Sequence, residues 1–284
     1  MEKLARARDA YAEQIRTLAG LRSPALLRGL SRVPREEFLG PPPWRLLTVA
    51  DLGRGYRETS DPAELYDNVL VALDAERRLN NGEPAALLRW LDSLELRAGE
   101  RFLHVGCGVG YYTAIAAEAL RPGGRALGVE LDPSLAERAR HNLAGRDDVE
   151  IVSGDGAGLT GQSFDAIFVN AGATEILPAW LDSLAPGGRL LLPLTVGIGQ
   201  PHLGVGFMVL VRRDAGGDSA EFQGPVGVFH CAGARTEYGE SRLRRLFAAR
   251  PSGALPLRRQ PHREDSSCAL HGAGFCLAHP ASHE

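Results

Sequence analysis

Residues 102–110 read FLHVGCGVG, an apolar run that ends in three glycines separated by single residues. The run predicts a buried strand, and the apolar segment from Tyr111 to Leu120 predicts a helix directly after the glycine turn. This arrangement lets a ligand approach bare backbone at the positive end of the helix. Glu130 lies farther along the chain, at the end of a second apolar run. An acidic side chain at that place can accept hydrogen bonds from both hydroxyls of a ribose.

The composition is typical of a globular protein with one large domain or one domain with additions. The chain has 284 residues, of which 44% are hydrophobic and 24% charged. A net charge of −3 gives no reason to expect a nucleic-acid partner. We expect no membrane partner, because no apolar run approaches the roughly 18 residues that span a bilayer. The charged N-terminus does not resemble a signal peptide, and the four cysteines do not resemble a disulfide scaffold, so we expect a cytoplasmic location.

From residue 100 to residue 195 the sequence alternates between short apolar strands and helices. Strands that are apolar on both faces are typical of a parallel sheet covered by helices. We therefore expect a doubly wound, mostly parallel, Rossmann-like α/β domain in residues 96–250, after an N-terminal helical cap in residues 1–95. The expected strands are Phe102–Val105, Ala126–Glu130, Val149–Val152, Phe164–Asn170 and Arg189–Pro193, and the expected helices are Tyr111–Leu120, Pro133–Ala144 and Ile176–Leu184.

The flanking segments have weaker patterns. We expect residues 41–65 to be irregular and exposed, because three consecutive prolines begin that segment. Val205–Arg212 and Pro225–His230 predict an antiparallel pair of strands added to the sheet. Residues 251–284 are rich in Pro, Ser, Gly, Arg and His and predict a partly ordered C-terminal tail.

A glycine turn followed by a ribose-binding acid fits either a dinucleotide or S-adenosylmethionine. The turn lacks the Gly-x-Gly-x-x-Gly spacing that packs a pyrophosphate against the helix. Asp155, after the third strand, can accept a hydrogen bond from an adenine amino group. Asn170 ends the fourth strand, at the sheet edge where ligands of open α/β folds bind. These features favour S-adenosylmethionine.

With these residues the chain resembles a class I S-adenosylmethionine-dependent methyltransferase, and more narrowly the protein-L-isoaspartate O-methyltransferase family. That resemblance implies methyl transfer to the side-chain carboxylate of an isoaspartyl residue in a peptide or protein. It rests on segments that occur in the family's order and spacing: Val33–Phe38, Tyr66-Asp67, Gly110–Ala114, Gly154–Gly156, Phe164–Ile167 and Leu184–Leu190.

Site residues follow from the ligand argument together with the resemblance. The expected cofactor-binding set is His104, Gly106, Gly108, Gly110, Tyr111, Glu130, Leu131, Asp155, Gly156 and Asn170. On the side of the methyl acceptor we expect Tyr66, Asn80, Asn81 and Gly82, together with His104, to take part in catalysis.

Two of these positions depart from the family pattern. Gly82 stands where the family carries a serine whose hydroxyl helps to hold the substrate carboxylate. Asn80 or Asn81 can donate an amide hydrogen bond in its place, although the charge of Glu83 opposes an anionic substrate. His104 replaces an acidic residue of the family; it is either a hydrogen-bond donor near the cofactor or a neutral core residue.

Because of these departures, two other functions stay open. One is O-methyl transfer to a peptide or small molecule of a biosynthetic pathway, without isoaspartyl specificity. The other is cofactor binding without catalysis.

The tail carries a cluster of metal-ligand residue types, Cys268-x2-His271-x4-Cys276-x2-His279, with His262 nearby. The spacing resembles a compact zinc knuckle, but not a standard order of ligands. We expect these cysteines to pack against the domain and expect no metal ligands, with a zinc site as the alternative.

Overall fold

The computed structural model describes residues 2–48, 54–159, 161–250, 253–259 and 262–279. Its chain forms two compact units, and each combines segments that are distant in the sequence. The first unit contains residues 1–100 and 107–153, and the second contains residues 101–106 and 154–284. The three-part division expected from the sequence stays a prediction.

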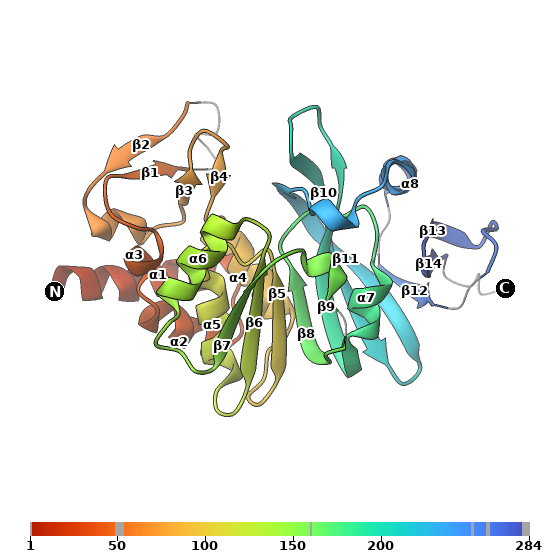
Figure 1. Cartoon of the computed structure of the whole chain (residues 1–284), viewed down its shortest axis with the longest axis horizontal. Coiled ribbons are helices and arrows are strands. Elements are labelled where there is room, and N and C mark those ends of the chain that lie inside the picture. The colour runs from red at the N-terminus through yellow and green to blue at the C-terminus, as the bar shows by residue number, and fades with distance from the viewer. Residues whose placement is uncertain (1, 49–53, 160, 251–252, 260–261, 280–284) are drawn as a thin grey trace. The chain divides into compact units, whose positions relative to one another are not determined.

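Three helices begin the first unit: α1 (Glu2–Ala19), α2 (Pro24–Arg32) and α3 (Arg35–Phe38) (Figure 1). The Ser23 side chain caps α2 by accepting a hydrogen bond from Leu26 N, and Pro24 occupies the first helical position. Asp92 lies in helix α4 (Pro84–Ser93) and accepts hydrogen bonds from the backbone N–H groups of Arg22 and Ser23. These bonds fix the turn between α1 and α2.

A small four-stranded sheet follows α3 in the first unit, and it corrects our expectation for residues 41–65. Its strands lie in the order β2-β1-β3-β4, and Trp44, Leu46 and Leu65 belong to a buried core there. Part of this expected loop, residues 49–53, lies outside the described residues. The bounds are β1 (Trp44–Leu47), β2 (Arg57–Thr59), η2 (Pro62–Leu65), β3 (Leu70–Asp74) and β4 (Leu79–Asn80).

The rest of the first unit is α/β. Helix α5 (Tyr111–Leu120) has the expected bounds and is buried along nearly its whole length. Two parallel strands, β6 (Arg125–Glu130) and β7 (Val149–Ser153), are joined by α6 (Pro133–Asn142), which Asp132 caps.

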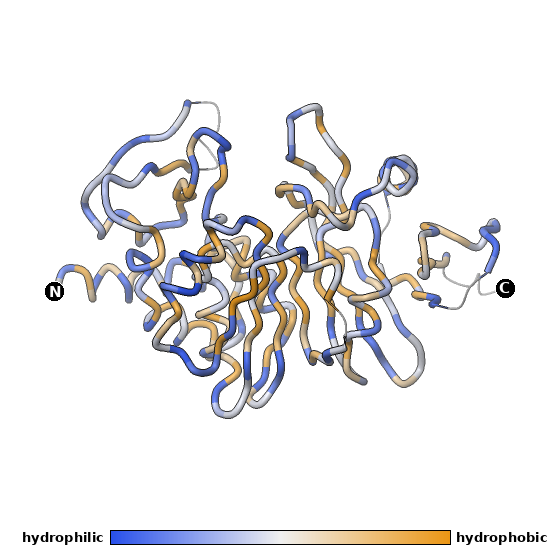
Figure 2. The backbone as a smooth tube through the Cα atoms, viewed as in Figure 1, coloured by the Kyte–Doolittle hydropathy of each residue, from blue (hydrophilic) through white to orange (hydrophobic). Residues whose placement is uncertain are grey.

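The second unit is built on one long mixed sheet. Its strands lie in the order β13-β14-β12-β11-β10-β9-β8-β5, with β5, β8 and β9 parallel and the others antiparallel. Figure 2 shows orange, hydrophobic backbone along the strands and mainly blue or white backbone in the connecting loops. The bounds are β5 (Arg101–Val105), η3 (Gly156–Gly158), β8 (Phe164–Val169), α7 (Pro178–Asp182), β9 (Leu184–Gly197), β10 (Leu203–Asp214), β11 (Gly217–Phe229), η4 (Ala232–Ala234) and α8 (Glu237–Ala248).

The C-terminal residues contain more regular structure than the sequence predicted. Strand β12 (Ala254–Arg258) pairs with β11, and the hairpin of β13 (Cys268–Gly272) and β14 (Phe275–Ala278) pairs with β12. Alternate residues of β12 are buried, Leu255 and Leu257 among them. Within the described residues, the expected tail is therefore largely part of the sheet.

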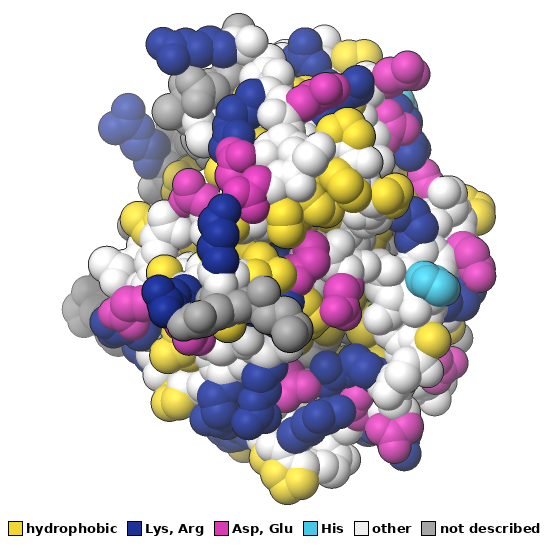
Figure 3. Space-filling model, turned by 90° about the vertical axis from the view of Figure 1, so that its left-hand side faces the viewer, with side chains coloured by type: hydrophobic (Ala, Val, Ile, Leu, Met, Phe, Trp, Pro, Cys, Tyr) yellow, Lys and Arg dark blue, Asp and Glu magenta, His cyan; other side chains and the backbone are white. Residues whose placement is uncertain are grey.

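Charged side chains of both signs mix on the face shown in Figure 3, where dark blue and magenta groups lie next to one another. Ion pairs such as Lys3–Asp61 and Arg45–Glu58 join parts of the first unit that are distant in sequence. Among the described residues, no helix combines the length and apolarity required to cross a membrane.

Arg35 is the most deeply buried cation of the first unit, with no exposed surface. Its Nη1 donates hydrogen bonds to Leu65 O and Asp67 O, at 2.6 and 3.0 Å, and its Nη2 donates to Val69 O at 2.7 Å. One guanidinium thus satisfies three carbonyls of the segment that leads into β3. A buried carbonyl without a donor is costly, so this contact fixes the path of residues 65–69.

His104, in β5, is a buried polar residue within the core of the second unit. Its ring stacks on Phe168 with centroids 5.1 Å apart, Phe102 lies 6.1 Å away, and no part of the residue is exposed. Burial lowers the pKa of His104 to about 3, because the surroundings do not solvate an imidazolium. The structure therefore favours the neutral core role among the two that the sequence allowed.

Replacing Arg35 by methionine should destabilise the protein by about 3 kcal/mol or more, because the buried carbonyls of Leu65 and Val69 lose this donor. The free energy of unfolding in urea measures this effect. Arg45→Met is the matched control, since Arg45 is exposed and pairs with Glu58; its effect should stay below about 0.5 kcal/mol. Equal effects of the two changes would show that the Arg35 contacts contribute little.

Acidification should destabilise the fold through His104. The folded pKa is lowered, so the unfolded state takes up the proton first, and stability present above pH 6.5 is lost as the pH falls toward 3. The loss is about 1.4 kcal/mol for each pH unit within that window. Urea unfolding of wild type and His104→Leu between pH 7.5 and pH 4.5 measures it. The variant should lose less stability on acidification, and identical pH profiles would contradict the assignment.

Candidate active site

The glycine turn after β5 exposes backbone at the start of α5. Gly106, Gly108 and Gly110 have positive φ angles of 76°, 58° and 87°. A Cβ atom on Gly110 would lie 2.6 Å from Leu143 Cδ1, so the close packing of the turn against α6 requires glycine there. The first N–H groups of a helix have no partner within the helix, and here no side chain caps them. Gly108 N and Gly110 N already have acceptors, Glu130 Oε2 and Cys107 O, so the turn offers a ligand close approach to the backbone at the start of α5.

Glu130 ends β6 and ties its carboxylate to the glycine turn. Its Oε2 accepts a hydrogen bond from Gly108 N at 2.8 Å, and its Oε1 accepts from Asp132 N at 3.0 Å. A carboxylate has about four acceptor positions, so each oxygen retains capacity for one more donor. Two neighbouring acceptors of this kind fit the two hydroxyls of a ribose. Leu131 follows with 53% of its surface exposed, which provides an apolar contact beside them.

Three further candidates lie in the second unit. Asp155 is exposed, and its Oδ1 caps η3 by accepting from Ala157 N at 2.9 Å. Gly156 is buried, and a Cβ there would lie 2.4 Å from Val105 Cγ1. Asn170 N donates to Val105 O at 2.8 Å, so the ends of β8 and β5 are joined where Asn170 begins the next loop.

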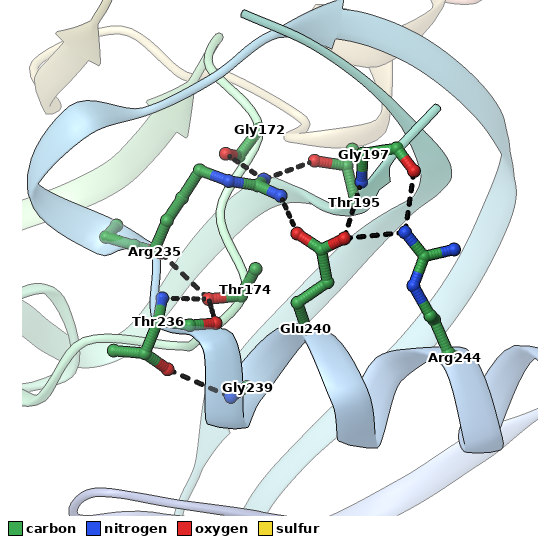
Figure 4. Close-up of polar contacts among 10 residues, drawn as sticks. Gly172, Thr174, Thr195, Gly197, Arg235, Thr236, Gly239, Glu240 and Arg244 are labelled. Carbon is green, nitrogen blue, oxygen red and sulfur yellow. Dashed lines mark hydrogen bonds and ion pairs between the residues drawn. The ribbon is translucent and has the colours of Figure 1, made fainter. Parts of the chain in front are cut away.

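A polar network fixes the loop that follows Asn170 (Figure 4). Arg235 Nη1 donates to Gly172 O and to Thr195 Oγ1, both at 2.9 Å, and Arg235 Nη2 pairs with Glu240 Oε2 at 2.9 Å. The Glu240 carboxylate also accepts from Gly197 N at 3.1 Å. The network links the loop after Asn170 to β9 and α8, so these hydrogen bonds hold that loop in place. No local pattern in the sequence relates Arg235 to residue 172, so this contact was not predicted.

The Tyr66 hydroxyl is engaged within the first unit, and the catalytic role expected for it stays a prediction. The residue is buried, and its hydroxyl donates to Glu36 Oε2 and accepts from Arg8 Nε at 2.8 Å and Arg35 N at 3.1 Å. Burial, together with the neighbouring Glu36 carboxylate, raises the pKa of Tyr66 well above its usual range. Tyr66 therefore holds α1 and α3 to the segment that leads into β3.

Asn80 and Asn81 differ sharply in their surroundings. The Asn80 amide is engaged locally, since its Oδ1 accepts from Tyr56 Oη at 2.7 Å and its Nδ2 donates to Arg78 O at 2.9 Å. Asn81 is 8% exposed, and its backbone N donates to Val71 O at 2.8 Å. Among the described residues, no group accepts a hydrogen bond from Asn81 Nδ2, although that nitrogen is buried. A buried amide donor without an acceptor is costly, which makes Asn81 Nδ2 a candidate contact for a ligand.

Gly82 follows with a φ of 79°, in the turn before α4. A Cβ atom at this position would lie 3.0 Å from Leu87 Cδ2, and the Gly82 carbonyl accepts a hydrogen bond from Tyr112 Oη at 3.2 Å. Glu83, next to it, accepts from Asn68 Nδ2 at 2.6 Å. The carboxylate that opposes an anionic substrate is thus partly satisfied by an amide.

Tyr111 occupies the first turn of α5, but its ring belongs to the core. The ring is fully buried and contacts Phe38 and Tyr112 edge-on, with centroids 5.5 and 5.0 Å away. Of the expected cofactor residues, Tyr111 and His104 therefore have fully buried side chains, and Tyr111 contributes its backbone to the start of α5.

Comparison with known proteins agrees with this arrangement. A family profile described as protein-L-isoaspartate(D-aspartate) O-methyltransferase matches residues 56–208. The protein-L-isoaspartate O-methyltransferase of Methanopyrus kandleri is 31% identical over 207 residues, which cover 70% of this chain and 79% of that protein. Protein-L-isoaspartate O-methyltransferase 1 of Anaeromyxobacter sp. is 36% identical over 219 residues, which cover 74% and 88%.

A solved structure shares the fold. The Plasmodium falciparum protein-L-isoaspartate O-methyltransferase, determined in complex with S-adenosyl-L-homocysteine, aligns with a TM-score of 0.61 at 17% identity. The alignment covers 80% of this chain and 98% of that one. The Rossmann-like α/β fold and the family expected from the sequence are both confirmed. The chain belongs to the protein-L-isoaspartate O-methyltransferase family of class I S-adenosylmethionine-dependent carboxyl methyltransferases.

Proposed function

We propose that this protein methylates the side-chain carboxylate of an isoaspartyl residue in a peptide or protein, and that Asn81 orients that carboxylate. The observation that carries the proposal is the buried Asn81 Nδ2, for which the described residues provide no acceptor. The donor lies beside Gly82, where the family's hydroxyl is absent. An amide N–H that meets a carboxylate forms a charge-assisted hydrogen bond, which is stronger than one between neutral groups.

S-adenosylmethionine supplies an activated methyl group on a sulfonium. Within the first unit we assign Gly108, Gly110, Glu130 and Leu131 to its binding, because the glycines allow close approach to the backbone and Glu130 retains two acceptor positions. From the second unit we assign Gly106, Asp155, Gly156 and Asn170, whose backbone is fixed at the ends of strands.

Methyl transfer to a carboxylate requires little acid or base catalysis. A carboxylate is ionised at neutral pH and is itself the nucleophile, so no proton has to be removed. The protein's task is to hold the carboxylate in line with the methyl group and to exclude water. His104 suits this assignment as a neutral core group, since its pKa near 3 keeps it uncharged at physiological pH. Tyr66 and Asn80 are left out of the catalytic set, because their polar groups are engaged elsewhere.

A cytoplasmic location is part of the same proposal. All four cysteines are free thiols, and Cys107 and Cys231 are buried, which suits a reducing compartment. The acceptor would then be an intracellular protein or a peptide derived from one.

Replacing Glu130 by glutamine should weaken binding of S-adenosyl-L-homocysteine by about 1–3 kcal/mol, because two charge-assisted hydrogen bonds lose their acceptor charge. Isothermal titration calorimetry measures the affinity. Glu137→Gln is the matched control, since Glu137 is exposed on α6 and pairs with Arg140. Wild type should also discriminate against a 2′-deoxy analogue, and the variant should not. Full discrimination retained in the variant would place the ribose elsewhere.

Replacing Asn81 by leucine should lower kcat/KM for an isoaspartyl peptide by about 10–100-fold, the loss expected for one hydrogen bond to a charged group. The measurement is transfer of a labelled methyl group, with the matched aspartyl peptide as the substrate control. Asn80→Leu is the protein control and should change kcat/KM much less. Affinity for S-adenosyl-L-homocysteine should stay unchanged in both variants.

The same assay separates the remaining functions. If wild type binds S-adenosyl-L-homocysteine but labels neither peptide, the isoaspartyl assignment fails. Labelling of another peptide or metabolite would then show a redirected O-methyltransferase, and no turnover on any acceptor would show a binding protein.

A further inference from the structure

The C-terminal hairpin of the second unit places two metal-ligand side chains directly opposite each other. His271 of β13 pairs with Cys276 of β14 across a short turn at Ala273-Gly274. Side chains of directly opposed residues lie on the same face of a hairpin. Leu270 and Leu277 also pair, and both are buried, so the hairpin directs its other face into the core.

A β-bulge brings a third ligand to that face. Cys268 and His271 are three positions apart, and on a regular strand such residues face opposite sides. The register of the hairpin shifts between Cys268 and Leu270, which inserts one extra residue and turns Cys268 toward His271. The Cys268 Sγ atom lies 3.9 Å from His271 Nδ1.

The loop before β13 supplies the fourth candidate ligand, His262. His262 Nε2 lies 3.3 Å from Cys268 Sγ, and the His262 ring meets the His271 ring edge-on with centroids 4.8 Å apart. The ligand atoms of His262, Cys268, His271 and Cys276 all lie within 4.8 Å of one another. In a tetrahedral zinc site, a sulfur and a nitrogen ligand are separated by about 3.5 Å. Small side-chain movements would complete such a site.

We propose that His262, Cys268, His271 and Cys276 bind a zinc ion. Two thiolates and two imidazoles are a donor set that zinc prefers, and four protein ligands leave no position for a substrate. The ion would therefore have a structural role, joining the loop before β13 to the hairpin. This assignment does not depend on the methyl-transfer activity.

A hydrogen-bonded turn supports the ligands from outside. Asp265 Oδ1 accepts from Ser267 N at 2.8 Å and from Ser267 Oγ at 2.6 Å. Arg258 of β12 donates to the same Ser267 hydroxyl at 2.9 Å. These contacts fix the chain just before Cys268, as outer-shell groups do in metal sites.

The fourth candidate ligand in the structure differs from the one that the sequence spacing indicated. The spacing runs from Cys268 to His279, but His279 is exposed beyond the end of β14 and is not a member of the converging group. His262 takes its place. This difference provides a matched pair of variants, His262→Gln and His279→Gln.

The experiment uses the full chain, produced without a histidine tag and purified without added metal. Elemental analysis should find about one zinc ion per chain, and cobalt(II) should give the absorption of a tetrahedral thiolate site. In chelator competition, His262→Gln and Cys276→Ser should lower zinc affinity by more than about 100-fold, whereas His279→Gln should leave it unchanged. Binding of S-adenosyl-L-homocysteine reports that each variant is folded.

Two results would overturn the proposal. One is a wild-type chain that neither retains zinc nor binds it after full reduction of its thiols. The other is loss of zinc in His279→Gln with wild-type affinity in His262→Gln, which would show that the geometric assignment is wrong.

Discussion

A single buried guanidinium, that of Arg35, determines the path of the chain on the acceptor side of the first unit. Its three hydrogen bonds hold residues 65–69, and that segment leads directly into β3. Val71, in β3, in turn receives the backbone hydrogen bond of Asn81. The orientation of the Asn81 amide, which we assign to the substrate carboxylate, thus depends indirectly on Arg35, through residues 65–69 and β3. Loss of charge at Arg35 would disturb catalysis without any contact to substrate.

The sequence predicts the α/β elements well, because each carries its own signal. The run at 102–110, the bounds of α5 and the cap at Ser23 depend on neighbours within a few residues. The prediction for residues 41–65 was wrong, because the structure of that segment depends on distant residues. Strands β1 and β2 have four and three residues, too short for a period, and Trp44 and Leu46 are buried only through pairing with distant segments. The strands after residue 253 depend on β11 in the same way.

In the candidate site too, residues with a local sequence signal were predicted, and contacts between distant segments were not. Gly108, Gly110 and Glu130 are recognisable because their spacing alone places them around one turn, and Glu130 does meet Gly108 there. The contacts of the Tyr66 hydroxyl with Glu36 and Arg8 were not predicted, because no local pattern records the approach of those two residues. The contact between His262 and Cys268 was not predicted, because the β-bulge that turns Cys268 leaves no mark in residue spacing.

The backbone at Gly82 bears on how this lineage can change. A serine there would have to adopt a φ of 79° and accommodate Leu87 at about 3.0 Å, so restoring the family's hydroxyl would require compensating changes nearby. Gly82 is therefore a conformational constraint on this turn, and changes in what the turn recognises are easier at its neighbours, such as Asn81, than at Gly82 itself.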